Sequence, residues 1–108
     1  MKESDLMRLI QLEASKYGVR LFRNNVGVLQ DKNGRHLRYG LGTGSSDLIG
    51  WIGEGKYAGK FIAVEVKVGD SKLTPEQINF LNQVNGAGGI GICARSVQDV
   101  IDKLGPAT

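Results

Sequence analysis

Two residue types that often carry chemistry are almost missing from this sequence. Cysteine and histidine each occur once, as Cys93 and His36. A single cysteine cannot form a disulfide within the chain, nor a zinc site built from several thiolates. Cys93 lies in the apolar run 91–94, which favours a small buried hydrophobic side chain. A single histidine excludes, within one chain, any metal chemistry that needs two or more histidines.

Long hydrophobic runs are also absent. No apolar stretch approaches the roughly 20 residues that a helix needs to cross a bilayer, and no charged-then-apolar leader opens the chain. The expectation is a soluble, cytoplasmic (intracellular) protein without a membrane partner, of a kind that suits a bacterial or phage origin. A length of 108 residues with 41% hydrophobic residues predicts one globular domain over 1–108.

Acidic residues are scarce in the segment between Ala14 and Gly40. The net charge is +3, and the segment 14–40 holds a single acidic residue. A basic surface suits a phosphate backbone, so we expect nucleic-acid contacts here; the alternative is a solvated surface with chance clustering. The charged residues of this segment are Lys16, Arg20, Arg23, Lys32, Arg35 and Arg38, against Asp31. Arg20, Arg23, Arg35 and Arg38 are the predicted contacts, together with Ser46.

Apolar periodicity and turn residues predict an α/β protein. Helices are expected over residues 4–17, where Gly18 ends the apolar stripe, over 74–85, and over 96–104. Thr74 and Pro75 suit a helix start. The strands are expected over 19–25, 26–29, 37–41, 47–52, 60–68 and 90–94, with an Asn33-Gly34 turn of a positive-φ hairpin type inside the third connection.

The strand over 60–68 is the clearest element. Its side chains are apolar on both faces, which is typical of a central strand. Glu65 and Lys67 are two residues apart and therefore project from the same face. A buried carboxylate is very costly unless a cation matches it. Glu65 therefore needs a partner, which either Lys67 or a metal ion would provide.

A second carboxylate, Asp47, precedes the neighbouring strand. Asp47, Glu65 and the Val66 backbone carbonyl offer hard oxygen ligands that suit Mg²⁺ or Mn²⁺. Such an ion would polarise a water and neutralise charge on a phosphate, while Lys67 supplies a compact positive charge. The alternative is a surface Glu-Lys pair with an aspartate that caps a loop, because Glu-x-Lys is common by chance.

The wider context resembles the PD-(D/E)xK nuclease superfamily, and within it the stand-alone VRR-NUC domains. The resemblance spans most of the chain, from Glu13 to about Cys93. The segments that carry it are Glu13, Gly44-Ser45-Ser46-Asp47-Leu48-Ile49, Phe61-Ile62-Ala63-Val64-Glu65-Val66-Lys67 and Leu73-Thr74-Pro75-Glu76-Gln77. One departure is Ser46, which stands where the name-giving motif has proline; the carboxylate that follows is kept.

This resemblance implies a restriction-endonuclease-like fold, a mixed β-sheet flanked by helices in the order α-β-β-β-α-β-α. It implies that Asp47 and Glu65 bind the metal, that Lys67 is catalytic, and that Glu13 and Gln77 line the site, with Glu13 as a further candidate ligand. It also implies a homodimer.

Two of these residues have simpler interpretations. Glu13 lies on the apolar stripe of the first helix, so it is either at the edge of the stripe, reaching solvent, or aimed at something positive. Gln77 is at the third helical position after Thr74, where glutamine completes a capping box. Both interpretations stay open at the level of sequence.

The expected function is a metal-dependent, structure-selective DNA endonuclease that hydrolyses phosphodiester bonds in duplex DNA or at branched junctions. Basic residues of the first half, with Lys56, Lys60 and Lys72, would hold the DNA backbone without reading bases. One alternative is a DNA-binding module on a nuclease scaffold that no longer cuts. The other is a subunit that dimerises and recruits proteins.

Overall fold

A computed structural model describes residues 1–105 of the chain. Three helices and six strands alternate along it in the α/β manner that the sequence predicts. The helices are α1 (Glu3–Ser15), α2 (Pro75–Gly86) and α3 (Val97–Leu104). The strands are β1 (Val19–Arg23), β2 (Gly27–Gln30), β3 (His36–Tyr39), β4 (Leu48–Ile52), β5 (Phe61–Val66) and β6 (Ile90–Ala94).

Four strands form the main sheet, in the order β1-β4-β5-β6. The β1–β4 and β4–β5 pairs are antiparallel, and β5–β6 is parallel, so the sheet is mixed. The parallel step follows from the chain passing through α2 between β5 and β6, since a parallel connection needs a crossover. The expected mixed sheet flanked by helices is confirmed.

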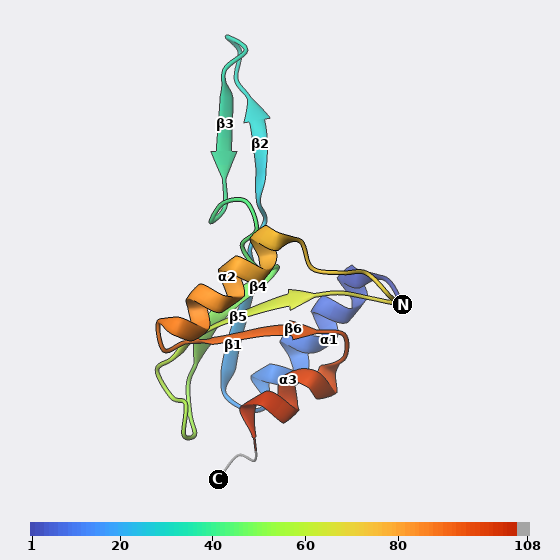
Figure 1. Cartoon of the computed structure of the whole chain (residues 1–108), viewed down its shortest axis with the longest axis vertical. Helices are drawn as coiled ribbons and strands as arrows, with labels where there is room; N and C mark the ends of the chain where they lie inside the picture. Colours follow the sequence, from blue (N-terminus) through green and yellow to red (C-terminus); the bar gives the residue numbers. More distant parts are fainter. Residues whose placement is uncertain (106–108) are drawn as a thin grey trace.

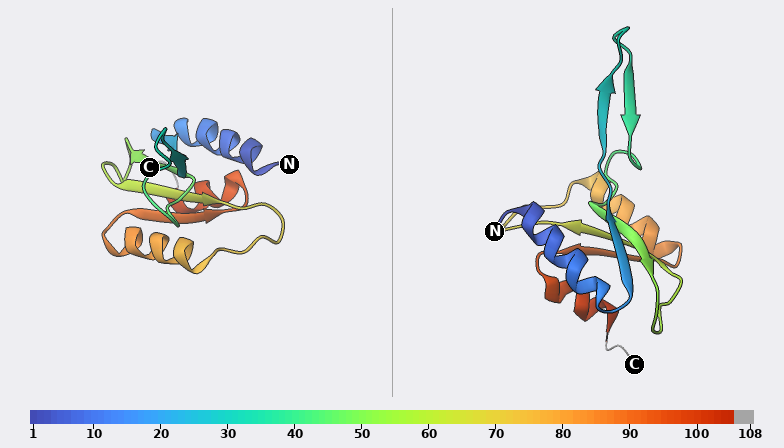
Figure 2. Two further views of the ribbon diagram at one scale, coloured as in Figure 1. Left: turned by 90° about the horizontal axis from the view of Figure 1, so that it is seen from above. Right: turned by 180° about the vertical axis from the view of Figure 1, so that it is seen from behind.

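The helices cover the sheet unequally. Helices α1 and α3 pack together on one face and α2 lies on the other, where it contacts β5 and β6 (Figure 2). The core lies mainly beneath α1 and α3, and Ile10, Leu48, Ile62, Val64 and Val100 are among its most buried side chains. The β1–β4 half of the sheet therefore has a helix on one side only.

Strands β2 and β3 stand apart as a two-stranded ribbon, which we call the arm (Figure 1). It projects from the body and gives the chain a longest axis of 54 Å, against 30 and 24 Å for the others. The sequence prediction of a turn at Asn33-Gly34 is confirmed, but its type is not. Of these two residues only Gly34 has a positive φ, whereas the two-residue turn expected for Asn-Gly needs a positive φ at both positions.

The turn is instead closed by Asp31. Its backbone N–H donates to the Arg35 carbonyl (2.8 Å), and its side chain accepts from the N–H groups of Asn33 and Arg35. An aspartate that satisfies the local backbone in this way favours a longer loop over a tight one. The arm strands are therefore joined by residues 31–35.

The expected helix and strand limits hold within a few residues. The first helix ends at Ser15 and Gly18 then takes φ +76, and the central strand is 61–66 instead of 60–68.

Cys93 is half-buried on β6, where burial raises the pKa of its thiol above the ordinary value. Across residues 1–105, no helix has the length and apolar character to cross a membrane.

Candidate active site

Asp47 and Glu65 meet at one end of the main sheet. The antiparallel register pairs Leu48 with Val64, so one further step places Asp47 opposite Glu65. Residues that face each other across an antiparallel pair share a face and lie close together. The two carboxylates that the sequence singled out therefore come together because strand β4 begins where β5 ends.

Asp47 is held from two sides. Its carbonyl accepts a hydrogen bond from the Asn24 N–H (2.8 Å), and its Oδ2 accepts from the Val66 N–H (2.8 Å). Asn24 also donates through its side chain to the Ser45 hydroxyl (2.8 Å) and the Ser46 carbonyl (2.9 Å). The loop before β4 is thus tied to the end of β1, and the Asp47 carboxylate has a defined position.

Glu65 is almost completely enclosed, with 2% of its surface exposed. Burial is the main reason that its pKa rises to about 8, and a hydrogen bond to the Asp47 side chain and the charge of Asp47 add to the rise. The nearby positive charge of Lys67 acts in the opposite direction. Without a cation, Glu65 therefore keeps its proton near neutral pH.

Lys67 follows directly after β5 and is half-buried. Its N–H donates to the Ala94 carbonyl (3.0 Å), which continues the parallel pairing with β6. The backbone at this position is therefore fixed, and the ammonium group is close enough to Glu65 to influence its pKa. The expected grouping of Asp47, Glu65 and Lys67 is present in the structure.

The surroundings of Asp47 suit a hard cation. A surface hollow of about 470 Å³ opens beside it, with Arg23, Asn24 and Tyr39 in its lining. The Ser46 hydroxyl next to it is buried at 1% exposure and, within residues 1–105, has no hydrogen-bond partner. Asp47 and Glu65 together offer the oxygen ligands that a Mg²⁺ or Mn²⁺ site prefers.

No larger ligand cluster is present. Among the described residues, no three His, Cys, Asp or Glu side chains gather where they could hold one ion. The protein carboxylates available are therefore Asp47 and Glu65. Other positions would fall to backbone oxygens such as the Val66 carbonyl, whose role stays a prediction, and to water.

The structure does not bring Glu13 to this site. Helix α1 runs antiparallel to β1, as the contacts of Met7 with Arg23 (3.4 Å) and of Gln11 with the Leu21 carbonyl (3.1 Å) show. Glu13 therefore lies near the start of β1, at the opposite end of the sheet from Asp47. Its carboxylate pairs with Lys16 (3.0 Å) and is partly exposed, which is the simpler of the two interpretations.

The acidic residue of α1 that does approach the site is Glu3. Burial dominates the raised pKa of Glu65, but the negative charge of Glu3 is close enough to add to it. Glu3 and Glu13 are separated by about 15 Å along the helix axis. A sequence signal for this existed: the short turn at Gly18 forces α1 and β1 to run antiparallel, which places the beginning of α1 beside the end of β1.

Gln77 takes part in the helix cap. Its side chain accepts from the Thr74 N–H (2.9 Å), while its own N–H donates to the Thr74 hydroxyl (3.1 Å), so the capping box is complete. The start of α2 nevertheless lies against the loop before Asp47. Gly44 has φ +84, and a Cβ there would come within 2.8 Å of backbone atoms of Glu76. A role for Gln77 in the site stays a prediction.

The predicted nucleic-acid contacts do not form one surface. Ser46 is corrected, because its buried side chain does not face solvent. Arg23 is exposed and lines the hollow beside Asp47. Arg20 lies opposite Trp51 on the main sheet, whereas Arg35 and Arg38 are on the arm, Arg35 in an ion pair with Asp31 (3.1 Å).

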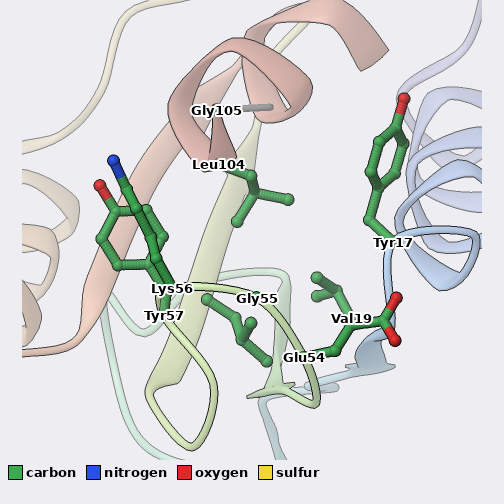
Figure 3. A pocket seen from close by; sticks show the side chains of 9 residues that line it. Tyr17, Val19, Glu54, Gly55, Lys56, Tyr57, Leu104 and Gly105 are labelled. Carbon is green, nitrogen blue, oxygen red and sulfur yellow. The ribbon is translucent and has the colours of Figure 1, made fainter. Parts of the chain in front are cut away.

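A separate cavity lies at the other end of the molecule and is too small for a substrate. Its volume is about 30 Å³, close to the space of one water molecule. Tyr17 and Tyr57 lie on opposite sides of it, with Leu104 between them (Figure 3). It is lined by none of the residues that the sequence proposed for the metal site.

Comparisons with known proteins agree with this fold. The family model of the VRR-NUC domain matches residues 2–98. A solved structure described as a VRR_NUC domain protein is similar in fold, with a TM-score of 0.56 and 17% sequence identity, and the match covers 94% of this chain and 84% of that one. No curated protein is similar in sequence.

Proposed function

The chain belongs to the VRR-NUC family of the PD-(D/E)xK nuclease superfamily, and from this premise we propose that it is a metal-dependent, structure-selective DNA endonuclease. It hydrolyses phosphodiester bonds, with branched junctions as the preferred substrate. The observation that carries the proposal is the buried Glu65, which faces Asp47 and has Lys67 two residues further along the chain.

The need for a cation follows from the energetics of Glu65. Its carboxylate is charged only at a high cost when it is enclosed and faces a second carboxylate. In the structure this cost appears as a pKa raised to about 8. The positive charge of Lys67 reduces this cost without removing it. A divalent ion bound between Asp47 and Glu65 would remove it, so a purely structural role explains these two carboxyl groups poorly.

Each residue has a defined part in the proposed site. Asp47 and Glu65, with the Val66 carbonyl, would hold Mg²⁺ or Mn²⁺. When bound, the ion supplies an acidified water and neutralises charge that develops on the phosphate. The Val66 N–H keeps the Asp47 carboxylate oriented, and the Asn24 N–H holds the Asp47 backbone through its carbonyl. Lys67 places a positive charge where it can orient the attacking water or contact the phosphate.

The DNA is held by its backbone. Arg23 is the predicted contact that lies next to the carboxylates, while Arg35 and Arg38 extend the positive charge along the arm. Contacts of this kind position a duplex without reading its sequence. A homodimer would present two such sites to one substrate, which suits paired cuts in a branched molecule.

The decisive experiment is cleavage of labelled duplex and branched DNA with Mn²⁺ or Mg²⁺. We expect Lys67→Ala to lower the rate by at least about 100-fold, since it removes a charge used in the transition state. Lys103→Ala, an exposed lysine on α3, is the matched control and should cut normally. Equal background cleavage by wild type and Lys67→Ala would contradict catalysis at this site.

The idle DNA-binding module predicts a different result. Such a protein would bind DNA in a salt-dependent manner without metal and without turnover. Calorimetric titration with Mn²⁺ separates the two cases. We expect binding that Asp47→Ala abolishes and that Glu54→Gln, a loop carboxylate on the opposite part of the molecule, leaves unchanged. Binding that survives Asp47→Ala would contradict the proposed ligands.

A further inference from the structure

Arg95 lies at the end of β6, next to the proposed catalytic lysine. The parallel register pairs Val66 with Ala94, and the Lys67 N–H donates to the Ala94 carbonyl (3.0 Å). Arg95 is the next residue after β6, so its backbone is beside that of Lys67. Neither the metal site nor the predicted DNA contacts include this arginine.

The side chain of Arg95 reaches into the segment that follows Lys67. Its Nη1 donates to the Gly69 carbonyl (3.0 Å) and its Nη2 to the Ser71 carbonyl (2.6 Å). A guanidinium group can make both bonds at once because its nitrogens form a rigid planar fork. The other end of the residue is fixed as well, since its backbone N–H donates to Asp99 Oδ2 (2.8 Å) in the first turn of α3. Arg95 therefore ties this segment to the body of the protein.

The tethered segment, residues 68–73, joins the site to helix α2. We call it the Lys67 loop, since it runs from Lys67 to the cap of α2 (Figure 1). The beginning of α2 also packs against the loop before Asp47, where Gly44 approaches the backbone of Glu76. A shift of the Lys67 loop would therefore move the lysine and the start of α2 together, relative to the two carboxylates.

The Lys67 loop has few other restraints. Val68 packs on the core at its beginning, but residues 69–72 are exposed. Within residues 1–105, the one further hydrogen bond of the loop backbone runs from the Ser71 N–H to the Val68 carbonyl and is long (3.4 Å). A hollow of about 430 Å³ lies beside the loop, with Val68, Gly69 and Arg95 in its lining. Because packing does not fill this space, the fork of Arg95 is the main restraint on the middle of the loop.

The charge of Arg95 acts on backbone dipoles and not on a carboxylate. Across the described part of the chain, residues 1–105, the ion pairs are Lys16–Glu13 and Arg35–Asp31, and Arg95 is in neither. Hydrogen bonds of an exposed side chain contribute little to the net stability of a fold. What two such bonds from one rigid group do fix is the conformation of the segment that accepts them. A role in placing the loop therefore explains the arrangement better than a role in global stability.

We propose that Arg95 is a positioning residue of the nuclease site. By holding two carbonyls of the Lys67 loop, it keeps the loop in one conformation and so places the Lys67 ammonium relative to Asp47 and Glu65. The role rests on the proposed nuclease function, because only a site that uses Lys67 gains from the tether. The part of Arg95 in the reaction is indirect, since it acts through the loop.

The first test needs no activity. NMR order parameters of the backbone amides in metal-free protein should be lower in Arg95→Ala than in wild type at residues 68–73, with the core strands unchanged. Lys103→Ala, which removes an exposed charge from α3, is the matched control and should leave the loop as rigid as in wild type. Loop order parameters that are the same in Arg95→Ala and wild type would overturn the tether.

The second test is a double-mutant cycle of Arg95 and Lys67, measured as single-turnover cleavage at saturating Mn²⁺ and DNA. Arg95→Ala alone should lower the rate constant by about tenfold or more, since a small misplacement of a positioned group has effects of this size. Its affinities for Mn²⁺ and DNA should stay unchanged. In protein that already carries Lys67→Ala, Arg95→Ala should have little further effect, because the group that it places is gone.

Conservative replacement separates geometry from charge. Arg95→Lys keeps the positive charge without the fork, so it should recover only part of the rate. Added guanidinium should raise the rate of Arg95→Ala toward wild type, whereas methylammonium should not. Equal rescue by the two ions would overturn the role of the fork.

Catalysis and positioning can fail separately. A folded Arg95→Ala, checked by its thermal midpoint, that cuts as fast as wild type would overturn the positioning role, and so would an equal effect of Arg95→Ala with and without Lys67. If wild type itself does not cut, the nuclease proposal fails and the positioning role falls with it. The order parameters decide by themselves whether Arg95 tethers the loop.

Discussion

The main sheet and the arm show how differently two antiparallel pairings can be supported. In the sheet, β4 and β5 lie between neighbouring strands and beneath helices, and Leu48, Ile62 and Val64 are completely buried. In the arm, every residue of β3 is exposed, and within residues 1–105 no third strand pairs with the ribbon. Backbone pairing is similar in the two, so the difference in stability comes from apolar burial. The site lies in the well-packed region, whereas the strands of the arm are exposed.

The largest effect that separates the two regions should come from shortening a core side chain. We expect Ile62→Ala to lower the free energy of unfolding by about 4 kcal/mol, because it removes buried methyl groups and leaves a cavity. Val28→Ala, in strand β2 of the arm, should change it by less than about 0.5 kcal/mol. Urea unfolding measures both. Equal losses would show that the arm is part of the cooperative core.

The second prediction concerns the charged residue inside the well-packed region. The folded pKa of Glu65 is about 8 and the ordinary value is 4.5. Between these two pH values the unfolded chain releases this proton while the folded chain keeps it. The contribution of Glu65 to stability is therefore complete below about pH 4.5 and is lost as pH rises through 8.

Glu65→Gln tests this contribution, because it keeps the shape and removes the charge. In metal-free protein at pH 8 we expect it to stabilise the fold by roughly 2–3 kcal/mol, and to flatten the decline of the thermal midpoint between pH 5 and 8. Glu54→Gln is the exposed control. Added Mn²⁺ should raise the midpoint of wild type and not of Glu65→Gln. A pH profile that is the same in the two proteins would contradict the raised pKa.

The central part of the site could be predicted because a strand has a two-residue period. That period places Glu65 and Lys67 on one side of a strand, and a strand that is apolar on both faces makes the carboxylate buried. The prediction for Glu13 was wrong because a helical period gives less information about position. The helical stripe identifies a face of α1 but not which end of the helix meets the site, and that depends on how α1 packs along β1.

Burial of short polar side chains was also beyond the sequence pattern. Ser46 resembles an exposed loop residue, yet the hydrogen bonds of Asn24 draw its segment against the end of β1 and enclose it. The arm shows the same limit. Alternation and Asn33-Gly34 predict a hairpin, but they do not say whether the hairpin joins the sheet. That depends on the long-range pairing of β1 directly with β4.

The smallest effect should come from local hydrogen bonds, and it sharpens the contrast between body and arm. Thr74→Ala removes the cap of α2 and should lower the free energy of unfolding by about 1 kcal/mol. Asp31→Ala removes the hydrogen bonds that close the arm turn and its ion pair with Arg35. Arg35 is exposed and Asp31 is only half-buried, so we expect a change of less than about 0.5 kcal/mol in global stability. Hydrogen exchange should instead show faster exchange confined to the arm amides, since a unit that opens locally responds without unfolding the rest. If Asp31→Ala lowered the global unfolding midpoint as much as Thr74→Ala, the arm would be coupled to the body more tightly than its exposed side chains indicate.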